Sequence, residues 1–152
     1  MLLFSTAGCV STDGGAVEAS WVVFTHDGRG VSDCACTCPR IAKIRLALAS
    51  ASDGTDPCAG NGACTFSCNS MTGATRFDIP PGTYAISLVP VGEDGNDIAP
   101  AAGGGTCNAT SPVGPVVREI TKGHVTELPA IEVDADCAAE CGGFDSEKVC
   151  TR

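Results

Sequence analysis

Cysteines are the residues of this chain best suited to chemistry. Eleven occur among 152 residues, and three alternate in the run Cys34-Ala35-Cys36-Thr37-Cys38. Cysteines at such spacings either oxidise to disulfides or bind soft metal ions, such as zinc or monovalent copper, as thiolates. In an extended segment alternate side chains share one face, so three thiolates could converge there. Other features of the sequence must therefore decide between a disulfide scaffold and a metal site.

Most of the sequence favours disulfides. No CxxC pair occurs, and the C-x₃-C pairs Cys64/Cys68 and Cys137/Cys141 have no histidine nearby. So many thiols also fit poorly with a reducing cytosol. We therefore expect an exported, disulfide-bonded protein that needs no metal or other cofactor. A thiolate metal site in the CxCxC run remains the alternative.

One cysteine, Cys9, differs from the others in what precedes it. A short apolar stretch ends in Ala7-Gly8 directly before it, and secretory signals end in such small residues. This pattern resembles the lipobox of bacterial lipoproteins, although Thr6 stands where that family usually has leucine. In the family the cysteine thiol receives a diacylglycerol and becomes the first residue of the mature chain. The resemblance implies lipidation of Cys9 at an outer membrane or cell surface; an ordinary terminal cysteine is the alternative.

Ten cysteines remain without Cys9, enough for five disulfides. The connectivity cannot be deduced, because even eight cysteines allow on the order of a hundred patterns. Neighbours within the run 34–38 are too close to bridge one another easily if that segment is extended. We expect them to reach the 58–68 group and the C-terminal group. The predicted disulfide cysteines are Cys34, Cys36, Cys38, Cys58, Cys64, Cys68, Cys107, Cys137, Cys141 and Cys150.

Alternation of apolar and polar residues dominates the chain and predicts short β-strands. These strands would position the cysteines. The run 43–48 fits a strand, since Ile44, Leu46 and Leu48 alternate with wetter neighbours, but it also suits a helix opened by Pro39. The other predicted strands cover 19–24, 64–68, 74–79, 84–88, 116–121 and 125–133. Short strands with frequent turn signals predict an all-β fold: a single antiparallel β-sandwich of about seven strands, stapled by disulfides, with long loops.

A resemblance supports this fold. The run from Phe77 to Ile86 reads F-x-h-x-P-G-x-Y-x-h, with "h" an apolar residue. It resembles a signature of transthyretin-like, carboxypeptidase-regulatory-like and Cna-B-like sandwich modules. The run 120–133 is similar to their closing strands around a glycine turn. The resemblance implies a buried Tyr84, and in the strand 74–79 we expect Phe77 and Ile79 to point inward.

The chain is expected to have four parts. Residues 1–9 read as a residual signal peptide and lipobox, and residues 10–15, small and polar, as a flexible tether. Residues 16–133 form the sandwich. Residues 134–152, with three cysteines, form a tail that packs on it.

Charge and motifs exclude several classes of function. The formal net charge of −9 would repel nucleic acid, and no apolar run approaches the roughly 18–20 residues of a membrane span. No serine or histidine stands in a known catalytic motif, so we expect no enzyme. The runs 53–56 and 94–97 are reminiscent of calcium loops, but both lack the ligand count and the bidentate glutamate. Plain turns are the better interpretation of both.

Two functions remain. The first is a surface binding or structural module without catalytic activity, held to the membrane only through its lipid, whose loops 31–40, 50–63 and 92–114 contact a protein or glycan partner. The second is a secreted cysteine-rich inhibitor or effector, in which the same loops occupy a protease cleft. Lipid on Cys9 distinguishes the two.

Overall fold

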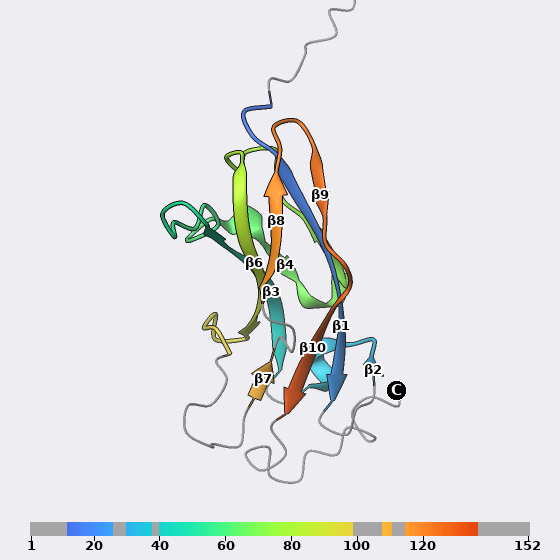
Figure 1. Ribbon diagram of the computed structural model, residues 1–152. Coiled ribbons are helices and arrows are strands. Elements are labelled where there is room, and N and C mark those ends of the chain that lie inside the picture. The colour runs from blue at the N-terminus through green and yellow to red at the C-terminus, as the bar shows by residue number, and fades with distance from the viewer. Residues whose placement is uncertain (1–11, 26–29, 38–39, 99–107, 111–114, 137–152) are drawn as a thin grey trace, which may run out of the picture.

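A computed structural model describes residues 12–25, 30–37, 40–98, 108–110 and 115–136 (Figure 1). Its described residues form ten β-strands and three short 3₁₀ turns, with no α-helix among them. The strands form two sheets. These strands, together with the disulfides Cys34–Cys68 and Cys58–Cys64, confirm the expected all-β, disulfide-stapled fold.

The long strand β1 organises the first sheet. Its C-terminal half lies in the order β2-β1-β10-β7, and its N-terminal half pairs with β5 and β9. The Val17, Trp21 and Val23 side chains of β1 are buried in the core that this sheet shares with the second sheet. The strands are β1 Ala16–Thr25, β2 Gly30–Val31, β5 Thr72–Ala74, β7 Asn108–Thr110, β9 Val125–Glu127 and β10 Ile131–Asp136.

The second sheet is antiparallel, in the order β4-β3-β6-β8. Its strands are β3 Ile41–Ser50, β4 Thr65–Ser67, β6 Gly82–Gly92 and β8 Val116–Ile120. Strand β3 pairs with β6 from end to end, and Ile44, Leu46 and Leu48 are all 0 % exposed. Residues 43–48 therefore form a strand and not the helix that Pro39 could have opened. Their buried side chains recur at every second residue, whereas a helix would bury residues three and four apart.

The inner faces of the two sheets share one hydrophobic core. Trp21 and Val23 of β1 belong to the same cluster as Leu46 of β3 and Ile86 of β6. Tyr84 is buried as expected, 5 % exposed, and its hydroxyl donates a 2.8 Å hydrogen bond to the carbonyl of Pro80. The two layers thus pack over one core, as the layers of a sandwich do.

The expected antiparallel pairing holds throughout the second sheet but only in part of the first, because β1 pairs in parallel with both β9 and β10. After β8 the chain turns at Lys122-Gly123, where Gly123 has φ +75°. It then follows β1 in the same direction. The predicted strand 125–133 is divided into two, and alternation alone cannot show this because it fixes neither a strand's partner nor its direction.

The predicted strand 74–79 is also wrong in part. Strand β5 ends at Ala74, and residues 77–78 form a turn. Phe77 is 38 % exposed rather than inward, whereas Ile79 is buried and forms a β-bridge with Gly15. The turn changes the side-chain alternation, so only one of the two apolar residues reaches the core.

The folded domain begins before Ala16. Gly14 and Gly15 were expected in the flexible tether, but both are buried. Their amides donate 2.9 Å hydrogen bonds to the carbonyls of Phe77 and Ile79, and the Gly14 carbonyl accepts from Gly123. The expected tether therefore ends at Asp13.

Candidate functional site

A disulfide between Cys34 and Cys68 joins the two halves of the described cysteine-rich region. Cys34 opens the 3₁₀ turn η1, Cys34–Cys36, and Cys68 opens η3, Cys68–Ser70. The two Cα atoms are 6.0 Å apart although 34 residues separate them in sequence. The expectation that the CxCxC run reaches the 58–68 group is confirmed for Cys34.

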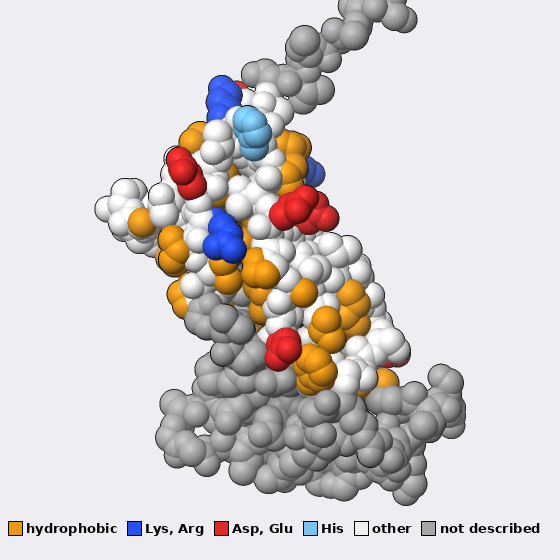
Figure 2. Space-filling view, turned by 45° about the vertical axis from the view of Figure 1, so that its right-hand side comes forward, with side chains coloured by type: hydrophobic (Ala, Val, Ile, Leu, Met, Phe, Trp, Pro, Cys, Tyr) orange, Lys and Arg blue, Asp and Glu red, His pale blue; other side chains and the backbone are white. Residues whose placement is uncertain are grey.

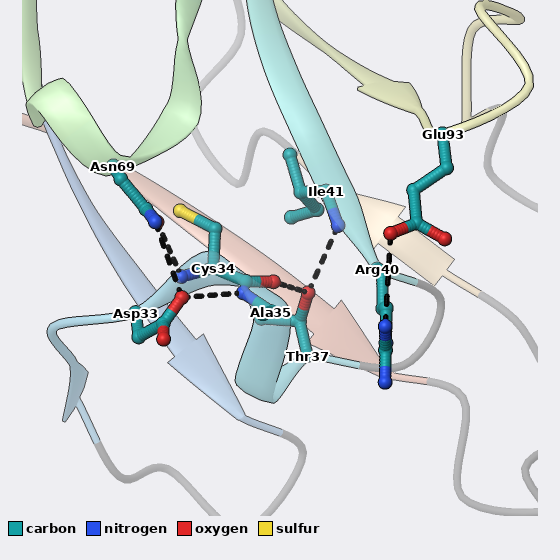
Figure 3. Close-up of polar contacts among 8 residues, drawn as sticks. All are labelled: Asp33, Cys34, Ala35, Thr37, Arg40, Ile41, Asn69 and Glu93. Carbon is teal, nitrogen blue, oxygen red and sulfur yellow. Dashed lines mark hydrogen bonds and ion pairs between the residues drawn. The ribbon is translucent and has the colours of Figure 1, made fainter.

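Asn69 fixes the geometry around this disulfide (Figure 3). Its Oδ1 accepts a 2.7 Å hydrogen bond from the amide of Cys34, and its Nδ2 donates to Oδ1 of Asp33 at 3.2 Å. Oδ1 of Asp33 also accepts from the amide of Ala35 at 2.9 Å. Sequence reasoning missed Asn69, because its position beside Cys68 has meaning only once Cys68 is known to pair with Cys34.

Trp21 of the core strand β1 contacts the turn that carries Cys68. Nε1 of Trp21 donates a 2.9 Å hydrogen bond to the carbonyl of Cys68, and the Trp21 amide donates to the carbonyl of Met71. The Trp21 ring stacks on Phe66 with centroids 6.3 Å apart. The turn that carries Cys68 is therefore held to β1 by two hydrogen bonds from Trp21, whose ring also packs on the preceding strand β4.

Thr37 connects the cysteine-rich loop to the second sheet. Its buried hydroxyl donates to the carbonyl of Cys34 at 2.8 Å and accepts from the amide of Ile41 at 3.2 Å. Cys36 is also disulfide-bonded. Since a disulfide sulfur is not a thiolate, neither Cys34 nor Cys36 offers a metal ligand in this oxidised structure. We call residues 31–37 together with Cys68–Ser70 the stapled end.

A second disulfide, Cys58–Cys64, closes a short loop at the C-terminal end of the segment 50–63. Oδ1 of Asp56 accepts hydrogen bonds from the amides of Leu48 and Cys58, at 3.2 and 2.8 Å. The carboxylate thereby covers the edge of β3 beyond β4, where an open amide would otherwise face solvent. Asp56 is thus engaged in the chain's own hydrogen bonds rather than free for calcium.

An open pocket of about 780 Å³ lies between residues 50–57 and 80–84. Asp53 on its wall accepts from the hydroxyl and the amide of Thr55, and these hydrogen bonds hold the pKa of Asp53 below its ordinary value. Burial, and then the charge of Asp53, raise the pKa of the Tyr84 hydroxyl. A carboxyl held ionised in this way suits a turn better than proton transfer near neutral pH.

The run 94–97 is likewise a turn. Asp94 accepts from the amide and the side chain of Asn96, and Asp97 forms a 2.8 Å ion pair with Arg45 of β3. Arg40 faces Glu93 at 3.7 Å (Figure 3). In the part of the chain that the structure describes, no three His, Cys, Asp or Glu side chains gather as metal ligands would.

The loops expected to form the contact surface lie at both ends of the second sheet: residues 92–98 lie at the same end as the stapled end, and residues 50–57 at the other. The stapled end lies before the start of β3 and the 50–57 loop follows its end, so the length of the strand separates them (Figure 1). The loop 92–114 is described only in part. Cys9, Cys38, Cys107, Cys137, Cys141 and Cys150 lie outside the described residues.

Of the described residues, none belongs to a helix with the length and apolar character that a membrane span requires.

Comparison with known proteins gives no relative from which a role could be carried over. No protein-family model, no curated protein and no solved structure matches the chain.

Proposed function

We propose that the chain is an exported surface module, anchored by lipid on Cys9, that binds a protein or glycan partner or supports a structure without catalysing a reaction. Disulfides such as Cys34–Cys68 and Cys58–Cys64 support export, because such bonds persist in oxidising compartments. The lipobox-like residues before Cys9 support the anchor.

The observation that carries the proposal is the rigid support of the stapled end. Asp33, Ala35 and Asn69 are exposed, yet the backbone that carries them is fixed by the Cys34–Cys68 bond and by Trp21. A loop held in one conformation loses less entropy when it binds. Exposed polar groups on a rigid loop are therefore well suited to contact a partner.

A secreted inhibitor or effector is the second candidate, and it rests on the same rigid loop. A protease cleft also selects loops that are held in place before binding. The two candidates differ in the anchor: an inhibitor acts as a released protein, whereas the surface module acts at the membrane. They also differ in partner, since only the inhibitor must lower the activity of a protease.

Site-specific photo-crosslinking in the producing cells tests the contact surface. A benzophenone amino acid replaces Ala35 in the stapled end, and in a matched control it replaces Ala49, which is exposed on β3. We expect a single discrete product from position 35 and none from position 49. Products from position 49 alone, or none from either position, would contradict the proposal. A product identified as a protease would instead establish the inhibitor.

A further inference from the structure

The point at which the chain enters the domain limits how far the domain can lie from a lipid on Cys9. Gly14 is fixed by its hydrogen bonds to Phe77 and Gly123. Five residues lead from Cys9 to Gly14, and an extended chain spans at most about 3.6 Å per residue. The fixed glycine therefore lies within about 18 Å of the lipidated cysteine, whatever the path between them.

The surface around that point differs in charge from the rest of the protein. We call residues 12–15, 76–81 and 121–125 the N-terminal end. It carries two acidic side chains, Asp13 and Asp78, and two basic ones, Arg76 and Lys122, so its formal charge is zero, against −9 for the chain. Figure 2 shows basic, acidic and hydrophobic side chains close together at the top of the molecule. An anionic lipid surface would repel most of this protein, but not this end.

Two exposed apolar side chains flank the entering strand. Phe77 is 38 % exposed and Val125 is 46 % exposed. The carbonyl of Phe77 accepts from Gly14 on one side of β1, and Val125 pairs with Ala16 on the other. Both are therefore held within a few residues of the point where the tether joins the domain.

We propose that the N-terminal end rests on the lipid surface, with Phe77 and Val125 in the headgroup region. This inference rests on the proposed lipid anchor at Cys9. Phenylalanine and valine side chains gain from leaving water at such an interface. Arg76 and Lys122 extend their charged groups to the headgroup phosphates while their alkyl chains cover apolar surface.

This orientation points the stapled end away from the membrane. Strand β1 runs from the N-terminal end toward the stapled end (Figure 1), and nine residues separate Gly14 from Val23, the β1 residue that pairs with Val31. At about 3.3 Å per residue this separation is roughly 30 Å. The exposed groups of the stapled end then face a partner on the far side.

Quenching of tryptophan fluorescence by labelled lipids tests the orientation. The oxidised full chain is coupled through Cys9 to a maleimide phospholipid in vesicles of phosphatidylethanolamine and phosphatidylglycerol, with and without a headgroup nitroxide. Phe77→Trp and Val125→Trp each place a reporter in the N-terminal end, and Ala35→Trp places a matched exposed reporter in the stapled end. The native Trp21, 2 % exposed, gives the background in the unsubstituted chain.

We expect the nitroxide to remove about half or more of the emission added at positions 77 and 125, since groups at an interface lie about 5–10 Å into the headgroup boundary. Emission added at position 35 should not change. Quenching at position 35, or at none of the three positions, would overturn the orientation. Because the lipid is attached chemically, this outcome does not depend on whether cells lipidate Cys9, which is read separately from the mass of the native protein.

Discussion

Nε1 of Trp21 donates a 2.9 Å hydrogen bond to the carbonyl of Cys68, the residue whose sulfur is bonded to Cys34. One contact thus joins the centre of β1 to the disulfide that fixes the exposed loop. A substitution of Trp21 in the core should therefore also disturb the conformation of the stapled end.

Replacing Trp21 by phenylalanine keeps an aromatic ring in the core but removes the donor. The buried carbonyl of Cys68 then has no indole partner, which should lower the free energy of unfolding by about 1–2 kcal/mol. Urea denaturation measures the change. Val117→Ala on the exposed face of β8, where Val117 is 59 % exposed, is the control and should stay within about 0.5 kcal/mol. A Trp21→Phe loss no larger than that of the control would contradict the role of the bond.

The Cys34–Cys68 and Cys58–Cys64 disulfides should differ in their contribution to stability. Cys34 and Cys68 are 34 residues apart and Cys58 and Cys64 only 6. The loop-entropy relation then gives about 4 kcal/mol for the first and about 2 kcal/mol for the second. Paired alanine variants, Cys34→Ala with Cys68→Ala and Cys58→Ala with Cys64→Ala, compare them by denaturation. Equal losses would show that the staples act through something other than restriction of the unfolded chain.

Gly14 should not tolerate a side chain. A Cβ at this position would overlap the carbonyl oxygen of Ile79, which is backbone and cannot move aside cheaply. Gly14→Ala should therefore cost about 1–3 kcal/mol. The control Gly62→Ala meets no atom within 4 Å and should be nearly neutral. If both variants unfold like the parent protein, the domain does not begin at Gly14.

Glu127→Lys should stabilise the first sheet. Glu18 and Glu127 are register partners on the parallel strands β1 and β9, and both are exposed. Like charges at paired positions are unfavourable, and an opposite pair gains about 0.2–1 kcal/mol. The matched Glu132→Lys change, whose register partner on β1 is Val22, should gain less. High salt should reduce the difference between the two variants, and a difference that persists in 1 M salt would not be electrostatic.

Acid should destabilise the protein partly through two turn carboxylates. Hydrogen bonds from Thr55 lower the pKa of Asp53, and those from Asn96 lower the pKa of Asp94. A carboxyl whose pKa is lower in the folded state contributes stability above its unfolded pKa, about 3.9, and loses it as the pH falls through the folded value. The double variant Asp53→Asn with Asp94→Asn should show a shallower fall in melting temperature between about pH 4 and pH 2. An unchanged slope would contradict the assignment.

The strands that the sequence predicts well are those with one face exposed to solvent. Ile44, Leu46 and Leu48 alternate with wetter neighbours, and the same pattern in 84–88 identified β6. The local pattern at 43–48 was also compatible with a helix, and only the pairing with β6 excludes it. That pairing joins segments about forty residues apart in sequence, so the local pattern could not predict it. The parallel course of β9 and β10 along β1 depends on such long-range contacts too.

The candidate site was less predictable than the fold. The sequence indicated disulfides but not which cysteines pair, and the role of Asn69 follows from the pairing. Phe77 fits an inward strand position by sequence, yet the turn at 77–78 leaves it exposed beside Gly14. A local pattern carries no information about a turn that other segments impose.

Intact mass of the native protein extracted from its producing membrane, before and after reduction and alkylation, is the most direct test of the proposed function. The account predicts a chain that begins at Cys9 and carries acyl groups, with ten alkylations appearing only after reduction. A chain without acyl groups at Cys9, or free thiols at Cys34 and Cys36 before reduction, would contradict it.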